Sequence, residues 1–417
     1  MKVGIFTDSY SPLTNGVTIS TQSTVDAIRK LGHDVYVIAP SHPRHKDTEQ
    51  KIYRLASVEF FTPDARWAMQ LPQKSLLEAV RIDFDVIHGH SGGPISLLGW
   101  ELAQVKGIPF VYTYHTLWSK YTHYVMQGKL ISPRMVEASS KITGNLCDFI
   151  IAPTERVKKE LVSYGIHRDI KVLPTGIDLA SYAKVPKGYI REKLGIAKNA
   201  KILLSVSRLG KEKSVDFLLH SFVRIHAKHP NTVLVLAGSG PERRSLRKLA
   251  KDLGIQDSVY FLGVIRHTVI PKVYADADIF VFASQTETQG MVILEAIATG
   301  LPVVVVQDAA YKGFVLNNKN GFSVRKNYDS FAAAVDKLLT DKNLYTAFSK
   351  HAKETASKYS IDATAKYLEQ VYNRLIKQHE GKGRKRKVII QSIEEFSSLV
   401  KKTTNQVKDF RMKLKLP

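Results

Sequence analysis

Short runs of apolar residues recur along the first half of the chain and alternate with stretches of helical spacing. The first run, residues 3–6, is followed by a turn-rich loop and then by a helical pattern over 17–31 that ends at Gly32. Strands of a parallel sheet are apolar throughout, because helices cover both faces of such a sheet. The alternation therefore predicts a doubly wound α/β domain. Its further strands are predicted at 35–39, 85–90, 110–114, 148–153 and 170–174.

The same pattern begins again near residue 200, which predicts a second domain of the same class. A predicted strand at 200–208 leads into a predicted helix over 214–228. The segment 176–199 carries Gly, Pro and Lys without a strong period, so we expect it to connect the two domains. Two doubly wound domains joined in this way offer a ligand cleft between the carboxyl ends of their sheets. The other strands of the second domain are predicted at 232–238, 259–263, 279–284 and 302–306.

The end of the chain differs in character from both domains. Residues 381–387 form a basic run, and the apolar residues after it follow a four-three spacing that is typical of an amphipathic helix. Residues 381–417 hold 11 basic and 3 acidic side chains, an excess of 11 − 3 = +8. This basic amphipathic tail is expected to bind an anionic membrane surface or, alternatively, to form a short coiled coil or a self-docking helix. Its apolar positions are Ile389, Ile393, Phe396, Val400, Val407, Phe410 and Leu414, with Thr403 in register.

Composition limits the class of protein. A chain of 417 residues suits two domains. The 61 Lys and Arg against 38 Asp and Glu give 61 − 38 = +23, which favours an anionic partner such as nucleotide phosphate, anionic lipid or nucleic acid, or else only a basic surface. The single cysteine, Cys147, excludes a disulfide scaffold and suits a reducing compartment. Because there is no signal-peptide pattern and no apolar run of ~18 residues, we expect a cytoplasmic protein that could lie on a membrane surface.

The most specific motif is the string TETQGMVILEAIATGLPVV at 286–304. Glu287 falls in a strand-to-helix loop and Glu295 in the early part of the predicted helix. Two carboxylates at the carboxyl edge of a sheet can accept hydrogen bonds from sugar and ribose hydroxyls. Gly290 allows backbone N–H groups to approach a phosphate near the positive end of the helix. The alternative is a pair of solvated surface carboxylates. The donor-binding residues expected here are Glu287, Gly290, Met291, Val292 and Glu295.

This string resembles the hallmark of the retaining GT-B glycosyltransferases of family four: a Glu, seven intervening residues and a second Glu before a helix of small residues. In that family the first Glu contacts the donor sugar and the second holds the ribose hydroxyls, so the resemblance implies these roles for Glu287 and Glu295. It covers roughly residues 1–378. The fold that it implies is α/β of the GT-B type, with two doubly wound Rossmann-like domains facing each other across a cleft.

A second motif, SVSRLGKEKSVDFLLHSF at 205–222, places Arg208 and Lys213 in a strand-to-helix turn. Two cations and a helix N-terminus suit a diphosphate leaving group. From the residues alone, a solvated basic loop is an equally good interpretation. The resemblance implies that Arg208 and Lys213 neutralise the diphosphate.

Two further positions come from the predicted first domain. Gly16 lies in the loop FTDSYSPLTNGV, where Asn-Gly by itself is only a turn signal, and the resemblance implies that it approaches the donor phosphates. His115 follows a buried strand at its carboxyl end, and the resemblance implies an active-site role. The string HTLWSKYTHY resembles the bacterial diacylglycerol glucosyltransferases of the family. Those enzymes usually carry acidic residues where this chain has Ser119 and Lys120, so the acceptor stays open.

Other possible metal ligands receive a structural interpretation. Asp83-Phe-Asp85 and Asp276-Ala-Asp278 look like the manganese-binding pairs of a different glycosyltransferase fold, but each lies at the entrance of a predicted strand, where Asp is common as a turn residue. His88-Gly-His90 has no carboxylate or cysteine to complete a ligand set, and we interpret it as a loop lining the acceptor cleft. We therefore expect no metal and no cofactor.

The resemblance also implies a division of labour along the chain. Residues 1–175 are expected to bind the acceptor, 176–360 the nucleotide sugar, and 361–380 to form a helix that crosses back to the first domain, ahead of the tail. The implied activity is retaining, metal-independent transfer of a hexose, with glucose from UDP-glucose expected, to a membrane lipid such as 1,2-diacylglycerol, at the inner face of the cell membrane. The alternatives are a soluble or phosphatidylinositol-type acceptor, an epimerase or phosphorylase, and a nucleic-acid-binding protein. The basic run lacks interleaved aromatic residues, so no nucleic acid is expected.

Overall fold

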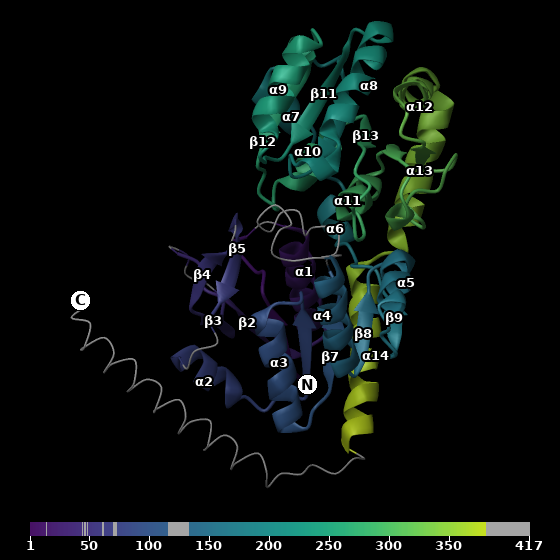
Figure 1. Cartoon of the computed structure of the whole chain (residues 1–417). Helices are drawn as coiled ribbons and strands as arrows, with labels where there is room; N and C mark the ends of the chain where they lie inside the picture. Colours follow the sequence, from purple (N-terminus) through teal and green to yellow (C-terminus); the bar gives the residue numbers. More distant parts are fainter. Residues whose placement is uncertain are drawn as a thin grey trace, which may run out of the picture. The chain divides into compact units, whose positions relative to one another are not determined.

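The computed structural model divides the chain into two compact units (Figure 1). The first unit is Met1–Leu173 together with the chain from Ala365, and the second is Pro174–Thr364. The structure describes residues 1–380 apart from Thr14, Arg44, Lys46, Thr48, Phe61, 70–72 and 116–132. The string at 115–124 that carries the diacylglycerol glucosyltransferase resemblance lies, apart from His115, outside these described residues, and so do Ser119 and Lys120 within it. The predicted tail helix at 381–417 also lies outside them.

The first unit is built on a seven-stranded parallel sheet in the order β3-β2-β1-β6-β7-β8-β9. The order runs one way from β1 to β3 and the other way from β6 to β9, so the direction of winding reverses between β1 and β6. Apolar side chains of neighbouring strands, such as Phe6, Ile38, Ile87 and Ile150, share one buried cluster. The strands are β1 Lys2–Thr7, β2 Asp34–Pro40, β3 Ile52–Leu55, β6 Val86–His90, β7 Phe110–Thr113, β8 Phe149–Ala152 and β9 Ile170–Val172.

Helices flank this sheet, as the sequence pattern predicts (Figure 1). The first of them begins at Gly16, where the side chain of Asn15 caps it by accepting a hydrogen bond from the Thr18 N–H at 3.0 Å. A two-stranded antiparallel ribbon, β4 Ser57–Phe60 with β5 Thr62–Ala68, was not predicted. The helices are α1 Gly16–Lys30, α2 Lys74–Val80, α3 Pro94–Lys106, α4 Pro133–Leu146 and α5 Glu155–Ser163.

The last described helix, α14 Ile361–Glu380, starts in the second unit and belongs to the first from Ala365 onward. Tyr372, on this helix, is fully buried. Its hydroxyl forms a hydrogen bond of 2.6 Å with Nδ1 of His88 on β6. The residues of α14 that belong to the first unit therefore pack on the sheet of that unit.

The second unit has a six-stranded parallel sheet in the order β12-β11-β10-β13-β14-β15. Successive residues of its strands point to opposite faces: Ile202 and Leu204 enter one buried cluster, and Leu203 enters the other. Both faces are thus apolar, which explains the continuous apolar runs in the sequence. The strands are β10 Lys201–Val206, β11 Thr232–Ala237, β12 Val259–Gly263, β13 Ile279–Phe282, β14 Val303–Val306 and β15 Gly321–Val324.

The helices of the second unit alternate with these strands. The segment 176–199, expected to connect the two domains, holds two short helices and belongs to the second unit. None of the helices described here is long and apolar enough to cross a bilayer. The helices are α6 Leu179–Tyr182, α7 Tyr189–Leu194, α8 Val215–Lys228, α9 Arg243–Asp252, α10 Ile270–Asp276, α11 Met291–Thr299, α12 Tyr328–Thr340 and α13 Lys342–Ser357.

Candidate active site

The two central strands of the second sheet, β10 and β13, are neighbours although the chain winds away from them in opposite directions. Loops that leave such a switch point diverge and open a crevice at the carboxyl ends of the strands. The loop after β10 carries Arg208 and Lys213, and the loop after β13 carries Glu287. The fold therefore brings the two predicted donor-binding motifs to one place.

Direct contact between these loops is made by an ion pair between Lys213 Nζ and Glu287 Oε1. The side chains of Lys213 and Glu287 are 14% and 16% exposed, so the pair is largely shielded from solvent. Lys213 ends a short 3₁₀ turn, Lys211–Lys213, that leads directly into α8. Arg208, in the same loop, is exposed. Arg208 and Lys213 thus lie on a single strand-to-helix turn, but Arg208 is exposed to solvent and Lys213 is largely shielded from it.

The loop after β13 ends at Gly290, which is the N-cap of α11. Its φ of +82° lies in the left-handed region, and a Cβ at this position would stand 3.0 Å from Cε1 of Tyr311. Both observations require glycine here. Met291 and Val292 open the helix, where the first backbone N–H groups have no partner within the helix. An anion placed at this end would also meet the positive end of the helix dipole.

Glu295, on the second turn of α11, is only 5% exposed. Its Oε2 accepts a hydrogen bond of 2.7 Å from the hydroxyl of Tyr274, and the hydroxyl of Tyr182 acts on the same carboxylate. Burial raises the pKa of Glu295 to about 7, and the two tyrosines oppose that rise. The interpretation of this residue as a solvated surface carboxylate is therefore excluded.

The sequence reasoning missed several residues that shape this site. Gln289, 5% exposed, accepts a hydrogen bond from the Thr175 N–H at 2.9 Å and donates one to the Thr175 carbonyl at 3.0 Å. This pair of bonds fixes the loop before Gly290 to the start of the second unit. Tyr311, which faces Gly290, donates a hydrogen bond to the Ser284 carbonyl. Gln289 lies inside the recognised string, whereas no sequence signal links the tyrosines to it.

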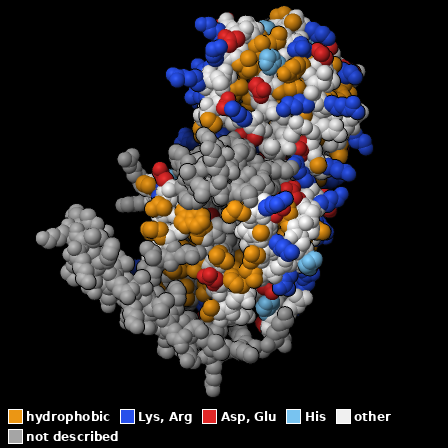
Figure 2. Space-filling view, in the orientation of Figure 1, with side chains coloured by type: hydrophobic (Ala, Val, Ile, Leu, Met, Phe, Trp, Pro, Cys, Tyr) orange, Lys and Arg blue, Asp and Glu red, His pale blue; other side chains and the backbone are white. Residues whose placement is uncertain are grey.

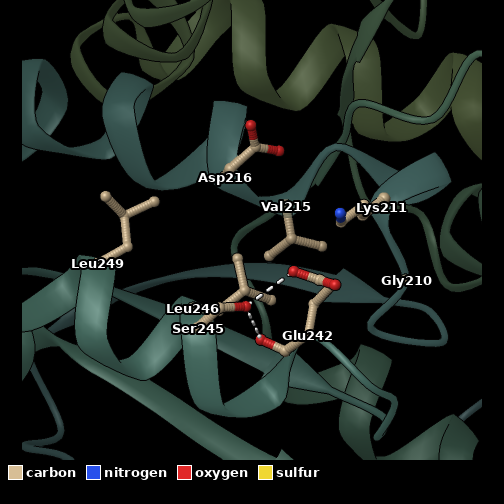
Figure 3. A pocket seen from close by; sticks show the side chains of 8 residues that line it. All are labelled: Gly210, Lys211, Val215, Asp216, Glu242, Ser245, Leu246 and Leu249. Carbon is tan, nitrogen blue, oxygen red and sulfur yellow. Dashed lines mark hydrogen bonds between the residues drawn. The ribbon is translucent and has the colours of Figure 1, made fainter.

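A pocket of about 430 Å³ lies beside the same loop, against the starts of α8 and α9 (Figure 3). Its wall includes Lys211 but also the carboxylates of Asp216 and Glu242. The hydroxyl of Ser245 donates hydrogen bonds of 2.8 Å to the carbonyl and to Oε2 of Glu242. Two carboxylates disfavour a diphosphate in this pocket. Arg208 and Lys213, in the loop after β10, remain the residues predicted to hold a diphosphate.

The corresponding switch point of the first sheet lies between β1 and β6. Gly16 is the first residue of α1, after the β1 loop, and among the described residues a Cβ at Gly16 would meet no atom within 4 Å. Packing against protein atoms therefore does not require glycine at position 16. Close approach of a ligand is the other explanation for this glycine. His115 follows β7, the next strand beyond β6.

His115, itself half-buried, belongs to a group of three histidines with the buried His88 and His90. Its Nε2 is 2.8 Å from Nδ1 of His90, and the ring of His90 lies 4.1 Å from that of His88, centroid to centroid. His88 is bonded on both sides, to Tyr372 and, at 2.7 Å, to Thr113. Burial lowers the pKa of His88 to about 3, that of His115 to about 4, and that of His90 well below its ordinary value. All three rings are neutral at pH 7.

This geometry corrects one sequence interpretation. His88 and His90 do not form a loop that lines a cleft: they end strand β6 and are 0% and 2% exposed. Polar residues can occupy a buried strand when hydrogen bonds satisfy them. Both nitrogens of His88 are bonded, whereas His90 is bonded through Nδ1 and its buried Nε2 has no hydrogen-bond partner among the described residues.

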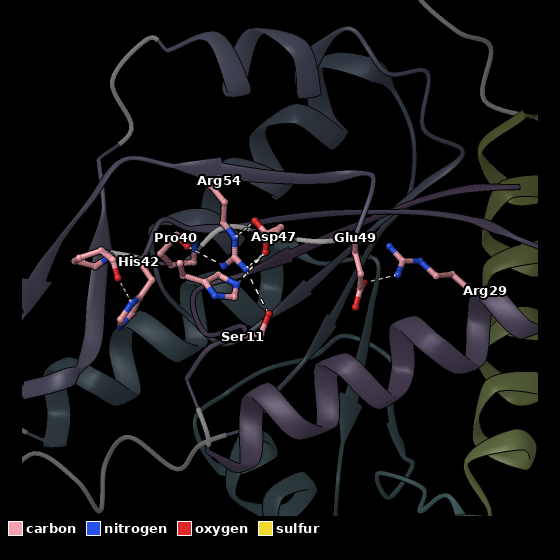
Figure 4. A network of polar contacts seen from close by, with 9 residues as sticks. Ser11, Arg29, Pro40, His42, Asp47, Glu49 and Arg54 are labelled. Carbon is pink, nitrogen blue, oxygen red and sulfur yellow. Dashed lines mark hydrogen bonds and ion pairs between the residues drawn. The ribbon is translucent and has the colours of Figure 1, made fainter. Parts of the chain in front are cut away.

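The β1 loop is also braced by a polar network around Arg54 (Figure 4). The guanidinium of Arg54 forms two hydrogen bonds with Asp47, of 2.9 and 2.6 Å, and donates to the Pro40 carbonyl at 3.0 Å and to Ser11 Oγ at 3.4 Å. It also stands over the ring of Tyr10, 5.5 Å from the centroid. The hydrogen bonds from Arg54 lower the pKa of Asp47. The charge of Arg54 is therefore matched by an ionised partner.

Three of the four aspartates with a metal-like spacing make structural contacts. Asp276 accepts hydrogen bonds from the N–H groups of Gly188 and Ile190 and so holds the start of α7. Asp278 pairs with Lys201 at 2.9 Å. Asp85 accepts a hydrogen bond of 2.7 Å from the Lys2 N–H. Within the part of the chain that the structure describes, no three His, Cys, Asp or Glu side chains form a metal-binding group.

Comparisons with known proteins agree with this arrangement. Residues 14–181 match the model of Glycosyltransferase Family 4, and residues 187–355 match that of Glycosyl transferases group 1. Over 382 residues the chain is 32% identical to an alpha-monoglucosyldiacylglycerol synthase of Streptococcus pneumoniae, a match that covers 89% of this chain and 86% of that protein. A protein of the same name from Acholeplasma laidlawii is 29% identical over 408 residues, covering 92% and 99%. The crystal structure of Anabaena Alr3699/HepE in complex with UDP-glucose has a TM-score of 0.71 at 19% identity, covering 90% of this chain and 100% of that one.

Proposed function

Because this chain belongs to glycosyltransferase family 4, and is a glycosyltransferase with two Rossmann-like domains of the GT-B type, we propose that it transfers glucose from UDP-glucose to the hydroxyl of 1,2-diacylglycerol. The observation that carries the proposal is the meeting of the Lys213 loop with the Glu287 loop at the β10/β13 switch point. Similarity over most of the chain to two alpha-monoglucosyldiacylglycerol synthases supports the choice of sugar and acceptor.

The second unit is the proposed donor-binding domain. Glu295 would accept hydrogen bonds from the ribose hydroxyls, and Glu287 from a hydroxyl of the sugar. Arg208 and Lys213 would hold the diphosphate, together with the backbone N–H groups at the start of α11. The ion pair between Lys213 and Glu287 keeps both side chains oriented toward the crevice before the donor arrives. Gly16, Met291 and Val292 are the proposed positions of close backbone approach to the donor.

The proposed chemistry retains the anomeric configuration and needs no metal. The bond between the sugar C1 and the diphosphate oxygen breaks while the acceptor hydroxyl oxygen bonds to C1 from the same face. The acceptor's proton passes to the departing diphosphate, so charge balances without a separate base. Arg208 and Lys213 stabilise the negative charge that develops on that group, which is electrostatic catalysis. His115, neutral at pH 7, orients a hydroxyl of the sugar or of the acceptor.

The described residues at the edge of the first sheet suit an uncharged acceptor better than a phosphate-bearing one. The described residues that directly follow β1, β6 and β7 are 8–13, 15, 91–93 and 114–115, and none of them carries a positive charge at neutral pH. The nearby Arg54 is paired with Asp47. A phosphoinositol-type acceptor would bring a phosphate that these residues leave unpaired, whereas the single hydroxyl of diacylglycerol needs no cation.

Peripheral attachment to the inner face of the cell membrane completes the proposal. The +8 tail would supply electrostatic attraction to anionic lipid. The described part of the first unit adds exposed apolar side chains, among them Val58, Trp67, Met135 and Ile142, with exposures of 50, 45, 58 and 64%. Figure 2 shows apolar side chains gathered on the visible face of this unit, while Lys and Arg are prominent on that of the second.

The test is transfer of labelled sugar into lipid. The purified chain would be given labelled UDP-glucose with vesicles that contain either diacylglycerol or phosphatidylinositol. We expect label in the organic phase with diacylglycerol, an α-linkage by NMR, and unchanged transfer after exhaustive chelation of metals. Lys211→Ala, a neighbouring exposed cation, serves as the matched control for Lys213→Ala. Transfer only to phosphatidylinositol would reject the acceptor, and a β-linked product would reject the retaining mechanism.

A further inference from the structure

Glu295 is held by two tyrosines that no sequence motif connects with it. Tyr274, on α10, is fully buried, and its hydroxyl lies 2.7 Å from Glu295 Oε2 and 3.2 Å from the carbonyl oxygen of Val292. Tyr182, the last residue of α6, is 6% exposed and lies with its ring centroid 6.2 Å from that of Tyr274. Phenols from two separate helices therefore converge on one carboxylate of a third helix.

We propose that Tyr274 and Tyr182 are positioning residues that hold Glu295 as an oriented acceptor for the two vicinal hydroxyls of the donor's ribose. This inference rests on the proposed function, because it takes a nucleotide sugar as the substrate. An ionised carboxylate offers about four lone-pair sites and no donor. The hydroxyls of Tyr274 and Tyr182 donate to some of these lone-pair sites and fix the plane of the carboxylate. The remaining sites can accept hydrogen bonds from the two ribose hydroxyls.

The tyrosines also act on the charge of the carboxylate. Burial raises the pKa of Glu295 to about 7, and the hydrogen bonds of Tyr274 and Tyr182 lower it. Among the described groups on the helices packed against α11, these two phenols are the ones that act on it. The pKa of Tyr182 is itself raised, first by burial, then by Glu295 and lastly by Asp178. Removing the Tyr274 hydroxyl would let Glu295 keep its proton at a higher pH. A protonated carboxyl has lost one of its acceptor sites to a donor.

A purely structural role is the competing explanation, because Tyr274 also joins α10 to α11 through the Val292 carbonyl. The two explanations differ in their effect on ribose recognition. A structural tie predicts lower stability and equal losses for all nucleotides. A positioning role predicts a loss confined to nucleotides that carry the ribose hydroxyls.

The experiment is calorimetric titration of the full-length protein with UDP and with 2′,3′-dideoxy-UDP. We expect the wild type to prefer UDP, and Tyr274→Phe to lose roughly three- to tenfold in UDP affinity with little change for the dideoxy nucleotide. Tyr359→Phe is the matched control, because its hydroxyl donates to the Gly313 carbonyl at 3.1 Å at the edge of the same apolar cluster. Its affinities should equal those of the wild type.

Two results would overturn the inference: unchanged UDP affinity in Tyr274→Phe, or an equal loss for both nucleotides. A wild type that binds both nucleotides equally would reject the ribose role of Glu295 and the tyrosine support with it. A wild type that binds neither would reject the proposed UDP donor, a failure that is distinguishable from the others. As a second readout, UDP affinity should fall as the pH drops through about 7, with a higher midpoint in Tyr274→Phe than in the wild type. The phosphate's own titration is common to both proteins, so an unmoved midpoint would also count against the inference.

Discussion

At the scale of single residues, the ion pair between Lys213 and Glu287 sets the starting state of the site. Two opposite charges in a shielded position attract each other more strongly than they would in water, so each keeps the other in place. An arriving diphosphate carries more negative charge than one carboxylate and can take over the ammonium group. With the roles proposed for these two residues, Glu287 would then be released toward the sugar that enters beside it. The pair would thus couple occupation of the phosphate position to the freeing of the sugar-binding carboxylate.

The three cations of this loop, Arg208, Lys211 and Lys213, are expected to contribute unequally to turnover. Arg208→Ala and Lys213→Ala should each lower turnover by roughly 100-fold, because each removes ~3 kcal/mol of charge stabilisation from the leaving group. Lys211→Ala should retain wild-type turnover. Steady-state kinetics with saturating donor provide the measurement, and melting curves verify that each variant folds. Near wild-type turnover in either of the first two variants would remove that residue from the mechanism.

Glu295 shows what such a site costs in stability. Its pKa in the folded chain, about 7, lies above the ordinary value of 4.5, so the folded state binds its proton more tightly than the unfolded state does. Stability is therefore lost as the pH rises from 4.5 through 7, by up to ~3 kcal/mol once the carboxyl is ionised. A buried carboxylate that destabilises the fold at neutral pH is typical of a functional site rather than a structural one.

At the scale of elements, α11 begins at Met291, and the reason is Gly290. A residue with φ of +82° directly before the first turn lets the chain leave β13 and enter the helix in the space left by Tyr311. The first N–H groups of α11 then stand near Glu287 in sequence, in the loop that contacts Lys213. A side chain at position 290 would have to displace either the tyrosine ring or the loop.

Gly290→Ala therefore has an effect beyond backbone strain. The left-handed conformation costs a non-glycine residue about 1–2 kcal/mol. Gly254→Ala provides the matched control: Gly254 follows α9 with φ of +71°, and a Cβ there would meet no described atom within 4 Å. Both variants should lose stability in urea unfolding, Gly290→Ala by more because its Cβ also meets the Tyr311 ring, and Gly290→Ala alone should lose donor affinity. Equal donor affinity in the two variants would show that position 290 matters only for the fold.

The elements also show which parts of the structure a sequence can predict. The buried parallel strands were predicted because continuous apolar runs identify them, whereas β3, β15 and the β4–β5 ribbon are short or lie at sheet edges and lack such a run. The short helices α6 and α7 carry too few turns to show a period. Each predicted donor-binding residue of the second unit came from a motif, but the contact between Lys213 and Glu287 depends on β10 lying next to β13, which only the fold supplies. Tyr182 and Tyr274 could not be predicted, because nothing local marks a distant hydroxyl as a partner of Glu295.

At the scale of the whole molecule, the two units follow one rule. Each has a parallel sheet whose winding reverses once, at β1/β6 and at β10/β13, and the proposed site residues lie after strands at or next to these points. In the first unit these residues are Gly16 and His115, and in the second they are Arg208, Lys213 and Glu287. Site position is thus a consequence of topology. The chemistry comes from the few polar residues that the topology places there.

The proposed acceptor, diacylglycerol, does not leave the bilayer, so the enzyme must bind the membrane surface to reach it. A polybasic segment gains about 1 kcal/mol for each cation close to an anionic leaflet, and an amphipathic helix adds apolar burial at the headgroup boundary. The tail combines both features in sequence, with +8 of the total +23. The exposed apolar residues of the first unit offer a second possible contact with lipid.

Truncation after Glu380 distinguishes the two candidate membrane contacts, the tail at 381–417 and the exposed apolar residues of the first unit. The cut leaves α14 whole, since this helix ends at Glu380 and its His379 lies 3.5 Å from Asp148 in an ion pair. We expect the truncated enzyme to remain in solution when anionic liposomes are sedimented, and binding of the full chain to weaken as salt rises, because the attraction is electrostatic. A full-length variant with the five cations of 382–387 replaced by Gln keeps the apolar stripe and isolates the contribution of charge. If the truncated enzyme still sediments completely, the tail is not the anchor, and Trp67, Met135 and Ile142 of the first unit become the residues to replace next.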